Sequence, residues 1–309
     1  LSTLVTFAST PHTTGRYVRD ALQQSNTVIT AGAQVPDNVV LGWGFDPPVP
    51  DYARHDVDTS PDPTLPELMR VLPAGFSPEL LVWVDSGQPM LSPAYRDLDA
   101  VKAAWFIDTH ISTTHRIEIA RHFDLVFLAQ KAQLDEFRAA GISRVAWLPL
   151  GCSPALHAIP PRPRHLDIAF VGSLTSASGE KRQHFIQAVR AAFPNHFIGH
   201  AWPHEMAEHY ASAKIVVNMC LNEDVNMRVF EAMASGALLI TDPAIGLEDL
   251  FTDGKELVIY RSVDEALALI RRYLDDHTSR EQIAAAGQAT VLKYHSYERR
   301  VETILAEAR

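Results

Sequence analysis

The residues best suited to chemistry lie in the stretch NEDVNMRVFEAMASGALLITD, which runs from residue 222 to residue 242. A helical pattern over 227–234 carries one carboxylate, Glu231, with Arg228 three positions before it and Asn226 at the helix entry. Asn, Arg and the free N–H groups of a helix N-terminus suit a diphosphate, and a carboxylate one turn further on can accept hydrogen bonds from adjacent ribose hydroxyls. The alternative, an Arg–Glu pair on a helix surface, is disfavoured because the flanking apolar residues indicate a buried helix.

A second anion-binding pattern is FVGSLTSASGEKRQHF at 170–185, where a strand ends in Gly172 and Ser173 and a helix begins near Glu180. Small residues allow backbone N–H groups to approach an anion, and Lys181 and Arg182 can close on it. The alternative is an ordinary turn with a solvated Lys-Arg pair. The loop is neither a Walker loop nor the three-glycine dinucleotide motif.

The first half of the chain has weaker candidates. STPHTTGRYV (9–18) predicts a strand, a loop with Gly15 and a helix, and a simple surface turn is the alternative. Asp108 and His110 end the run WFIDTH, where a carboxylate or an imidazole could serve as a base or orient a sugar. His110 could equally be a structural histidine. Asp85, at the end of LLVWVD, is a weaker example of the same pattern.

Positioning these residues requires alternating strands and helices. Continuous apolar runs predict buried parallel strands at 4–8, 39–43, 80–85, 103–108, 125–129 and 145–150, with helices at 15–23, 112–122 and 131–140 and a long surface loop over 46–66. After a proline-rich break at 152–166, strands are predicted at 166–172, 196–201, 214–219, 237–242 and 257–261, and helices at 180–192, 204–212, 227–234 and 263–276. Capping boxes are expected at Ser262–Glu265 and at Ser279–Gln282.

This order predicts an α/β protein with two doubly wound Rossmann-like domains facing a cleft. We expect an N-terminal domain over 1–155, a linker over 156–165 and a C-terminal domain over 166–285. A C-terminal helix over 286–309 could pack back on the N-terminal domain.

Composition and short motifs argue against several classes of protein. A net charge of −10 argues against nucleic acid as a partner. Cys152 and Cys220 form no motif and are expected to be buried free thiols. No run is long enough to span a bilayer, and the first residues do not resemble a signal peptide, so a cytoplasmic protein is expected. HEMAEH (204–209) has its second histidine one place too late for a zincin, so no metal is expected.

The spacing of Glu223 and Glu231, with seven residues between them, makes the chain similar to a known family. Together with EAMASGALLITD and GLEDLFTDGKELVIY, it resembles the C-terminal domain of the group 1, family 4-like glycosyltransferases of the GT-B fold. The likeness is greatest to their CgeB-like branch, through RVFEAMASGALLITD and the tail REQIAAAGQATVLKYHSYERRVETIL. It covers about residues 166–309 and is looser before them, where FIDTHIS and FDLVFLAQKAQLDEFRAAGISRVAWLPLGC are similar.

The resemblance implies a role for each matching residue. Glu231 would bind the nucleotide ribose and Glu223 would lie near the donor sugar. The other implied donor contacts are Gly172 and Ser173 under the diphosphate, Lys181 or Arg182 at the departing phosphate, Asn226 and Arg228 as a phosphate clamp, His200, Ala201 and Trp202 beside the nucleobase, and Gly15 between donor and acceptor. The family's usual Arg-x4-Lys pair is absent, which leaves the choice between Lys181 and Arg182 open.

The expected function is transfer of a sugar from a nucleoside diphosphate sugar, with a UDP-sugar favoured, to an acceptor of unknown kind. The resemblance favours a retaining, metal-independent hexosyltransferase without a cofactor. Two alternatives are a GT-B sugar-nucleotide epimerase, which needs no acceptor, and a sugar-nucleotide-binding protein without activity.

Overall fold

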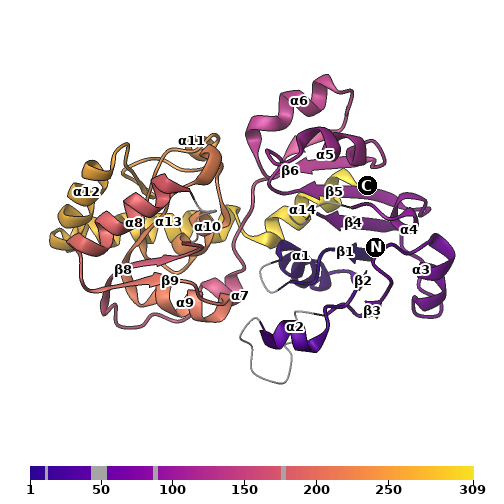
Figure 1. Cartoon of the computed structure of the whole chain (residues 1–309), viewed down its shortest axis with the longest axis horizontal. Helices are drawn as coiled ribbons and strands as arrows, with labels where there is room; N and C mark the ends of the chain where they lie inside the picture. The colour runs from indigo at the N-terminus through magenta and orange to yellow at the C-terminus, as the bar shows by residue number, and fades with distance from the viewer. Residues whose placement is uncertain (11–12, 43–53, 86–89, 175–178) are drawn as a thin grey trace. The chain divides into compact units, whose positions relative to one another are not determined.

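The computed structural model describes residues 1–10, 13–42, 54–85, 90–174 and 179–309 of the chain (Figure 1). The chain divides into two compact units, one of Leu1–Pro149 with Arg300–Arg309, and one of Leu150–Arg299. Each unit is built on one parallel sheet, so the prediction of two doubly wound α/β domains is confirmed.

The first unit contains a seven-stranded sheet in the order β3-β2-β1-β4-β5-β6-β7. Its strands are β1 (Ser2–Thr6), β2 (Thr27–Gly32), β3 (Val57–Asp58), β4 (Leu80–Val84), β5 (Val101–Phe106), β6 (Leu125–Leu128) and β7 (Val145–Trp147). All five residues of β4 are buried, which explains why LLVWV shows no polar alternation. Its helices are α1 (Thr14–Gln23), α2 (Asp37–Gly42), α3 (Leu65–Val71), α4 (Pro93–Arg96), α5 (Thr113–Ala120), η2 (Lys131–Gln133) and α6 (Leu134–Ala139).

The second unit contains a five-stranded sheet in the order β12-β11-β10-β8-β9. Its strands are β8 (Leu166–Val171), β9 (His196–Gly199), β10 (Ala213–Val217), β11 (Leu238–Thr241) and β12 (Val258–Ile259). Its helices are α7 (Pro154–His157), α8 (Glu180–Ala192), α9 (Pro203–Ala211), η4 (Leu221–Glu223), α10 (Met227–Ala234), α11 (Leu247–Leu250), α12 (Val263–Asp275) and α13 (His277–Tyr294). The buried core of this unit joins Ile168, Phe170 and Ile215 of the sheet to Phe185 of α8 and Ile270 of α12.

Two predictions for the first unit are wrong. The apolar run at 39–43 forms the helix α2 up to Gly42, and residue 43 lies outside the described residues. Val39 is 40% exposed and Val40 is buried, so the run does not lie within a sheet. The strand in this part of the chain is β2, whose two threonines, Thr27 and Thr30, interrupt its apolar residues and hid the strand. The second wrong prediction is the loop over 46–66. It is described from residue 54 onward, where the chain forms β3 and the start of α3.

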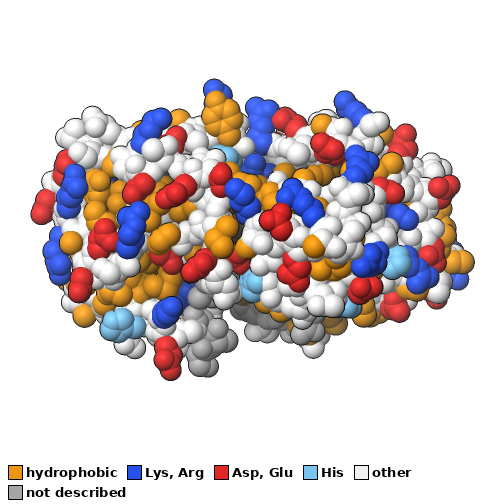
Figure 2. All heavy atoms as spheres, turned by 90° about the horizontal axis from the view of Figure 1, so that it is seen from above, with side chains coloured by type: hydrophobic (Ala, Val, Ile, Leu, Met, Phe, Trp, Pro, Cys, Tyr) orange, Lys and Arg blue, Asp and Glu red, His pale blue; other side chains and the backbone are white. Residues whose placement is uncertain are grey.

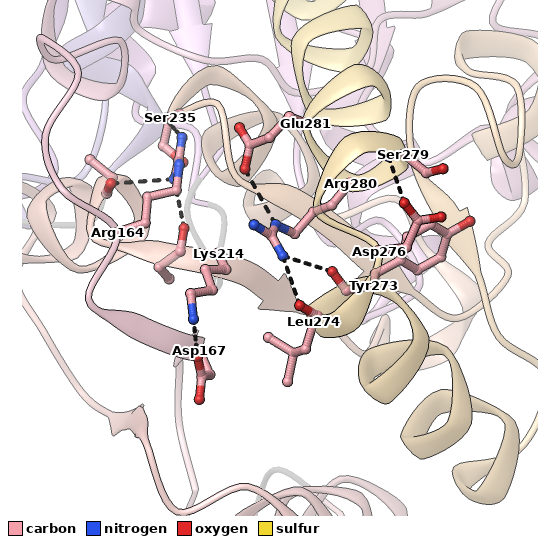
Figure 3. Close-up of polar contacts among 12 residues, drawn as sticks. Arg164, Asp167, Lys214, Ser235, Tyr273, Leu274, Asp276, Ser279, Arg280 and Glu281 are labelled. Carbon is pink, nitrogen blue, oxygen red and sulfur yellow. Dashed lines mark hydrogen bonds and ion pairs between the residues drawn. The ribbon is translucent and has the colours of Figure 1, made fainter.

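The segment between the two sheets is fastened to the second unit. Arg164 donates from Nη1 to the carbonyl of Ala213 at 2.6 Å and from Nη2 to that of Ser235 at 3.2 Å (Figure 3). It therefore holds the start of β10 and the end of α10 together. Nearby, Lys214 pairs with Asp167 across β10 and β8.

The turn between α12 and α13 is closed by side chains rather than by the predicted capping box. Arg280 donates to the carbonyls of Tyr273 and Leu274, and Asp276 accepts the N–H of Ser279 (Figure 3). Because Asp276 caps the helix, Ser279 lies inside its first turn, and the prediction of a cap at Ser279 is wrong. The predicted cap at Ser262 is confirmed, since its hydroxyl accepts the N–H of Glu265 at 3.1 Å.

The end of the chain forms a further helix, α14 (Tyr297–Glu307), after α13. Residues from Arg300 onward belong to the first unit, where Arg300 donates to the carbonyl of Pro149 at 2.7 Å. None of the helices in the described residues combines the length and the apolar character of a membrane span.

The face drawn in Figure 2 carries acidic and basic side chains interspersed with one another. With the net charge of −10, this distribution does not resemble the basic surface of a nucleic-acid-binding protein.

We expect Gly287→Ala to destabilise the second unit. Alanine usually stabilises a helix relative to glycine, but a Cβ at residue 287 of α13 would lie 2.2 Å from the carbonyl oxygen of Glu256. Overpacking of this kind costs roughly 1–3 kcal/mol of unfolding free energy. The measurement is urea denaturation with Gly42→Ala as the matched control, because a Cβ at Gly42 meets nothing within 4 Å. Equal stability of the two variants would contradict the close contact.

Candidate functional site

The sheet of the second unit has one topological switch point, between β8 and β10. From β8 the chain continues to β9, which pairs with one edge of β8. It then crosses to β10, which pairs with the other edge of β8. In open parallel sheets, ligands bind at the carboxyl ends of the strands where the winding reverses. The residues that follow these strands are Gly172 and Asn218, and they mark the edge of the sheet at which a ligand would bind.

Arg228, from the first turn of α10, spans this switch point. Its Nε donates to the carbonyl of Val171 at 2.8 Å, and its Nη1 donates to Oδ1 of Asn218 at 2.6 Å. Its guanidinium lies 4.5 Å from the ring centroid of Phe170. A Cβ at Gly172 would lie 2.4 Å from Nη2 of Arg228, so the glycine leaves the space that this guanidinium occupies.

Arg182, from the first turn of α8, approaches the same ring. It is 6% exposed, its Nη2 donates to the carbonyl of Met219 at 2.9 Å, and its guanidinium is 5.9 Å from the Phe170 centroid. Burial, and next the charge of Arg228, lower the pKa of Arg182 to about 10. The two cations therefore lie close enough to repel each other.

Neither arginine belongs to an ion pair between described residues. Within the same residues, Nε of Arg182 is buried and has no hydrogen-bond partner. Arg182 is buried and Arg228 is half-buried. Cations withdrawn from water without carboxylate partners are costly, so these two at a switch point favour an anionic ligand. Lys181, the neighbour of Arg182, is exposed on the helix surface.

Glu231 is buried on α10, one turn after Arg228, and is 7% exposed. Its Oε1 lies 3.7 Å from Nε2 of His157, which belongs to α7. The backbone N–H of Ser153 donates to Nδ1 of His157 at 3.0 Å, so a neutral His157 carries its proton on Nε2, facing the carboxylate. Burial raises the pKa of Glu231 to about 7, and the charge of Arg228 opposes this rise.

Asn226 stands at the N-terminus of α10 beside Arg228. Its Nδ2 donates to Oδ1 of Asn218 at 3.2 Å, and its own Oδ1 is buried without a partner in the described residues. Asn226, Arg228 and Gly172 therefore do lie together, as the sequence predicts.

The other residues predicted to contact the donor sugar nucleotide follow β8 and β9 of the second sheet. Ser173 follows Gly172 and is exposed. After β9, His200 is exposed, Ala201 is buried and Trp202 is half-buried, with the two rings edge-on at 4.9 Å.

Glu223 is exposed in the turn before α10, with φ of 58°. Its carbonyl accepts the N–H of Ile245 at 2.7 Å. It lines a cavity of about 510 Å³ together with residues 243–249 and Ile259. This cavity lies past the carboxyl ends of β11 and β12, so Glu223 faces a hollow separate from the contacts of Arg228.

The candidate site residues of the first unit differ in their burial and in their contacts. Gly15 allows α1 to approach Phe7 closely, because a Cβ there would lie 2.1 Å from the Phe7 ring. Asp108 and His110 follow β5 and are half-buried, and Asp108 has φ of 54°. Asp85 forms a fully buried ion pair with Arg116 at 2.7 Å, which indicates a structural role for this carboxylate.

Two residues of the arrangement escaped the sequence analysis, Asn218 and His157. Asn218 is the one polar residue in the apolar run IVVNM, and a polar residue at the carboxyl end of a buried strand was a usable signal. His157 lies in the proline-rich segment that the sequence predicts as a linker, where no pattern distinguishes it. Among the described residues, no group of three His, Cys, Asp or Glu side chains is placed to hold a metal ion.

Comparison with known proteins shows a similarity of sequence in part of the chain and a similarity of fold over the whole of it. Residues 156–306 match the model of a family described as glycosyl transferase-like. The structure is similar over 99% of both chains to HepE of Anabaena in complex with UDP and glucose, with a TM-score of 0.70 and 14% identity. None of the curated proteins matches the chain.

Two further solved structures have the same architecture. Sucrose-phosphate synthase of Thermosynechococcus elongatus is similar over 99% of this chain and 97% of its own, with a TM-score of 0.62 and 12% identity. A glycosyltransferase of Rickettsia africae has the same coverage, a TM-score of 0.67 and 11% identity. The fold is thus GT-B, and the family match supports a glycosyltransferase.

We expect Glu231→Gln to remove a pH dependence of stability. The pKa of Glu231 is raised in the folded chain, so its stabilising effect is complete below its unfolded pKa and is lost as pH rises through about 7. The variant should therefore be more stable than the wild type at pH 8.5, by an amount on the order of 1–3 kcal/mol, and equal to it near pH 5.

The measurement is denaturant unfolding at pH 5, 7 and 8.5, with Glu208→Gln on the exposed face of α9 as the control. A stability difference that stays constant over this pH range would contradict the raised pKa.

Proposed function

We propose that the chain transfers a sugar from a nucleoside diphosphate sugar, a UDP-sugar in the first instance, to an acceptor. The observation that carries the proposal is the pair of guanidiniums, Arg182 and Arg228, which flank Phe170 at the switch point without a carboxylate partner among the described residues. A diphosphate supplies the negative charge that this pair lacks. HepE, which shares the fold, has been crystallised with UDP and with UDP-glucose.

Cleavage of the sugar–phosphate bond moves negative charge onto the departing diphosphate. Arg182 and Arg228 would stabilise this charge, with Lys181 nearby and with the loop of Gly172 and Ser173 below it. The N-termini of α8 and α10 add partial positive charge. This set would allow the reaction without a divalent metal ion.

The remaining donor contacts follow from position. Glu231, held by His157, would accept hydrogen bonds from the ribose hydroxyls, and Asn226 would contact a phosphate. His200, Ala201 and Trp202 would form the nucleobase pocket after β9, and Glu223 would lie near the donor sugar. The Glu223–Glu231 spacing supports a retaining hexosyltransferase.

The first unit would present the acceptor. Gly15 would approach donor and acceptor, and Asp108 and His110, after β5, would orient the acceptor or act on its proton. The acceptor itself is left open, since saccharides, proteins, lipids and small molecules all carry suitable hydroxyls.

The test is calorimetric binding of UDP to the wild type and to Arg228→Ala and Arg182→Ala. Loss of one charge-assisted hydrogen bond to phosphate should weaken UDP binding by about 2 kcal/mol, roughly thirtyfold. Arg272→Ala is the matched control, because Arg272 is an exposed arginine of α12. If UDP, GDP, TDP and ADP all fail to bind the wild type, the proposed function is wrong.

Transfer is tested separately from binding. With a bound UDP-sugar and a panel of acceptors, we expect release of UDP that depends on the acceptor. Conversion of the UDP-sugar alone into an isomer would indicate the epimerase instead, and binding without any release would indicate a protein that binds but does not catalyse.

A further inference from the structure

Asn218 is fully buried at the carboxyl end of β10, at the switch point of the sheet. Both of its backbone polar groups are paired, since its N–H donates to the carbonyl of Ile240 at 2.9 Å and its carbonyl accepts the hydroxyl of Tyr260 at 2.9 Å. The residue thus has a fixed place in the sheet, next to β11 and the residue after β12.

The side chain of Asn218 is equally fixed. Its Oδ1 accepts from Arg228 at 2.6 Å and from Asn226 at 3.2 Å, and its Nδ2 donates to the hydroxyl of Thr241 at 3.0 Å. An arginine can only donate, so the oxygen of the amide must face Arg228 and the nitrogen must face Thr241. The amide therefore determines where the guanidinium of Arg228 lies.

The chemical type of this side chain matters because an aspartate would have the same shape. An aspartate at residue 218 could accept the same bonds from Arg228 and Asn226, and the hydroxyl of Thr241 could turn to donate to it. It would also form a buried ion pair with Arg228 and cancel its charge. The amide holds the arginine in the same place and leaves the charge uncancelled.

We propose that Asn218 is a positioning residue that fixes Arg228 while keeping its positive charge available for the diphosphate of the donor. This inference deepens the proposed function and rests on it for the identity of the anion. The probe for the test is inorganic pyrophosphate, which carries the anion without a base or a sugar.

The experiment compares Asn218→Asp with the wild type by calorimetric titration of pyrophosphate at several salt concentrations. We expect binding to weaken roughly tenfold or more, because the cancelled charge no longer attracts the anion. The dependence of the affinity on salt should also become less steep, because fewer positive charges meet the ligand. Affinity and salt dependence equal to those of the wild type would overturn the inference.

Thr241→Val is the matched control. It removes a hydrogen-bond partner of the same buried amide but adds no charge. We expect it to lower the melting temperature while pyrophosphate binding stays within roughly threefold of the wild type. If both variants lose affinity equally and keep the salt dependence of the wild type, Asn218 has a purely structural role and the inference is wrong.

If Asn218→Asp does not fold, Asn218→Ala serves for the test. It leaves Arg228 charged and bonded to the carbonyl of Val171 but removes its side-chain acceptor. We therefore expect weaker pyrophosphate binding with the salt dependence of the wild type, and unchanged affinity would contradict the inference. A wild-type protein that fails to bind pyrophosphate also overturns it. If pyrophosphate behaves as expected but no nucleoside diphosphate binds more tightly than pyrophosphate, the proposed function fails while the role of Asn218 stands.

Discussion

The second unit depends on the way in which one arginine is held across the ends of two neighbouring strands, β8 and β10. Arg228 leaves α10 and bonds to the backbone of β8 and to the side chain that ends β10. These bonds use two of the five N–H donors of the guanidinium, and they do not neutralise its charge, because both acceptors are neutral. The positions of Gly172, Phe170 and Asn218 follow from this constraint: one leaves space, one offers an aromatic face, and one supplies an oxygen.

The sequence predicted the elements that create this arrangement because their signals are local. Continuous apolar runs identified every strand of the second sheet, and the position of Arg228 and Glu231 on one short helix followed from helical spacing. Gly172 could be selected because a strand followed by small residues is a local pattern. In contrast, the contact of Arg228 with the end of β10 joins residues ten positions apart across a turn with two left-handed residues, Asn222 and Glu223, which no periodicity describes.

The wrong and the missed predictions also concern features that depend on contacts between residues distant in sequence. The run at 39–43 was predicted as a strand on hydrophobicity alone, whereas its exposure depends on which neighbours cover it, and that is a property of the fold. His157 could not be found because its importance comes only from the 3.7 Å approach to Glu231, a residue 74 positions away. Local elements were therefore predictable from the sequence, whereas the contacts between residues distant in sequence were not.

The charges of the site oppose each other in a way that links binding to stability. Arg182 and Arg228 repel each other in the absence of an anion, and burial raises the pKa of the nearby Glu231 because its charged form is poorly solvated. An anion beside the arginines would relieve the repulsion, and hydroxyl groups beside Glu231 would solvate its carboxylate. A ligand that carries both groups would thus relieve the repulsion between the arginines and solvate the carboxylate at once.

A nucleoside diphosphate is such a ligand, since its phosphates and its ribose hydroxyls are separated by only a few bonds. Arg228 and Glu231 lie less than one helical turn apart on α10, so the two protein groups are also close together, as the proposed ligand would require.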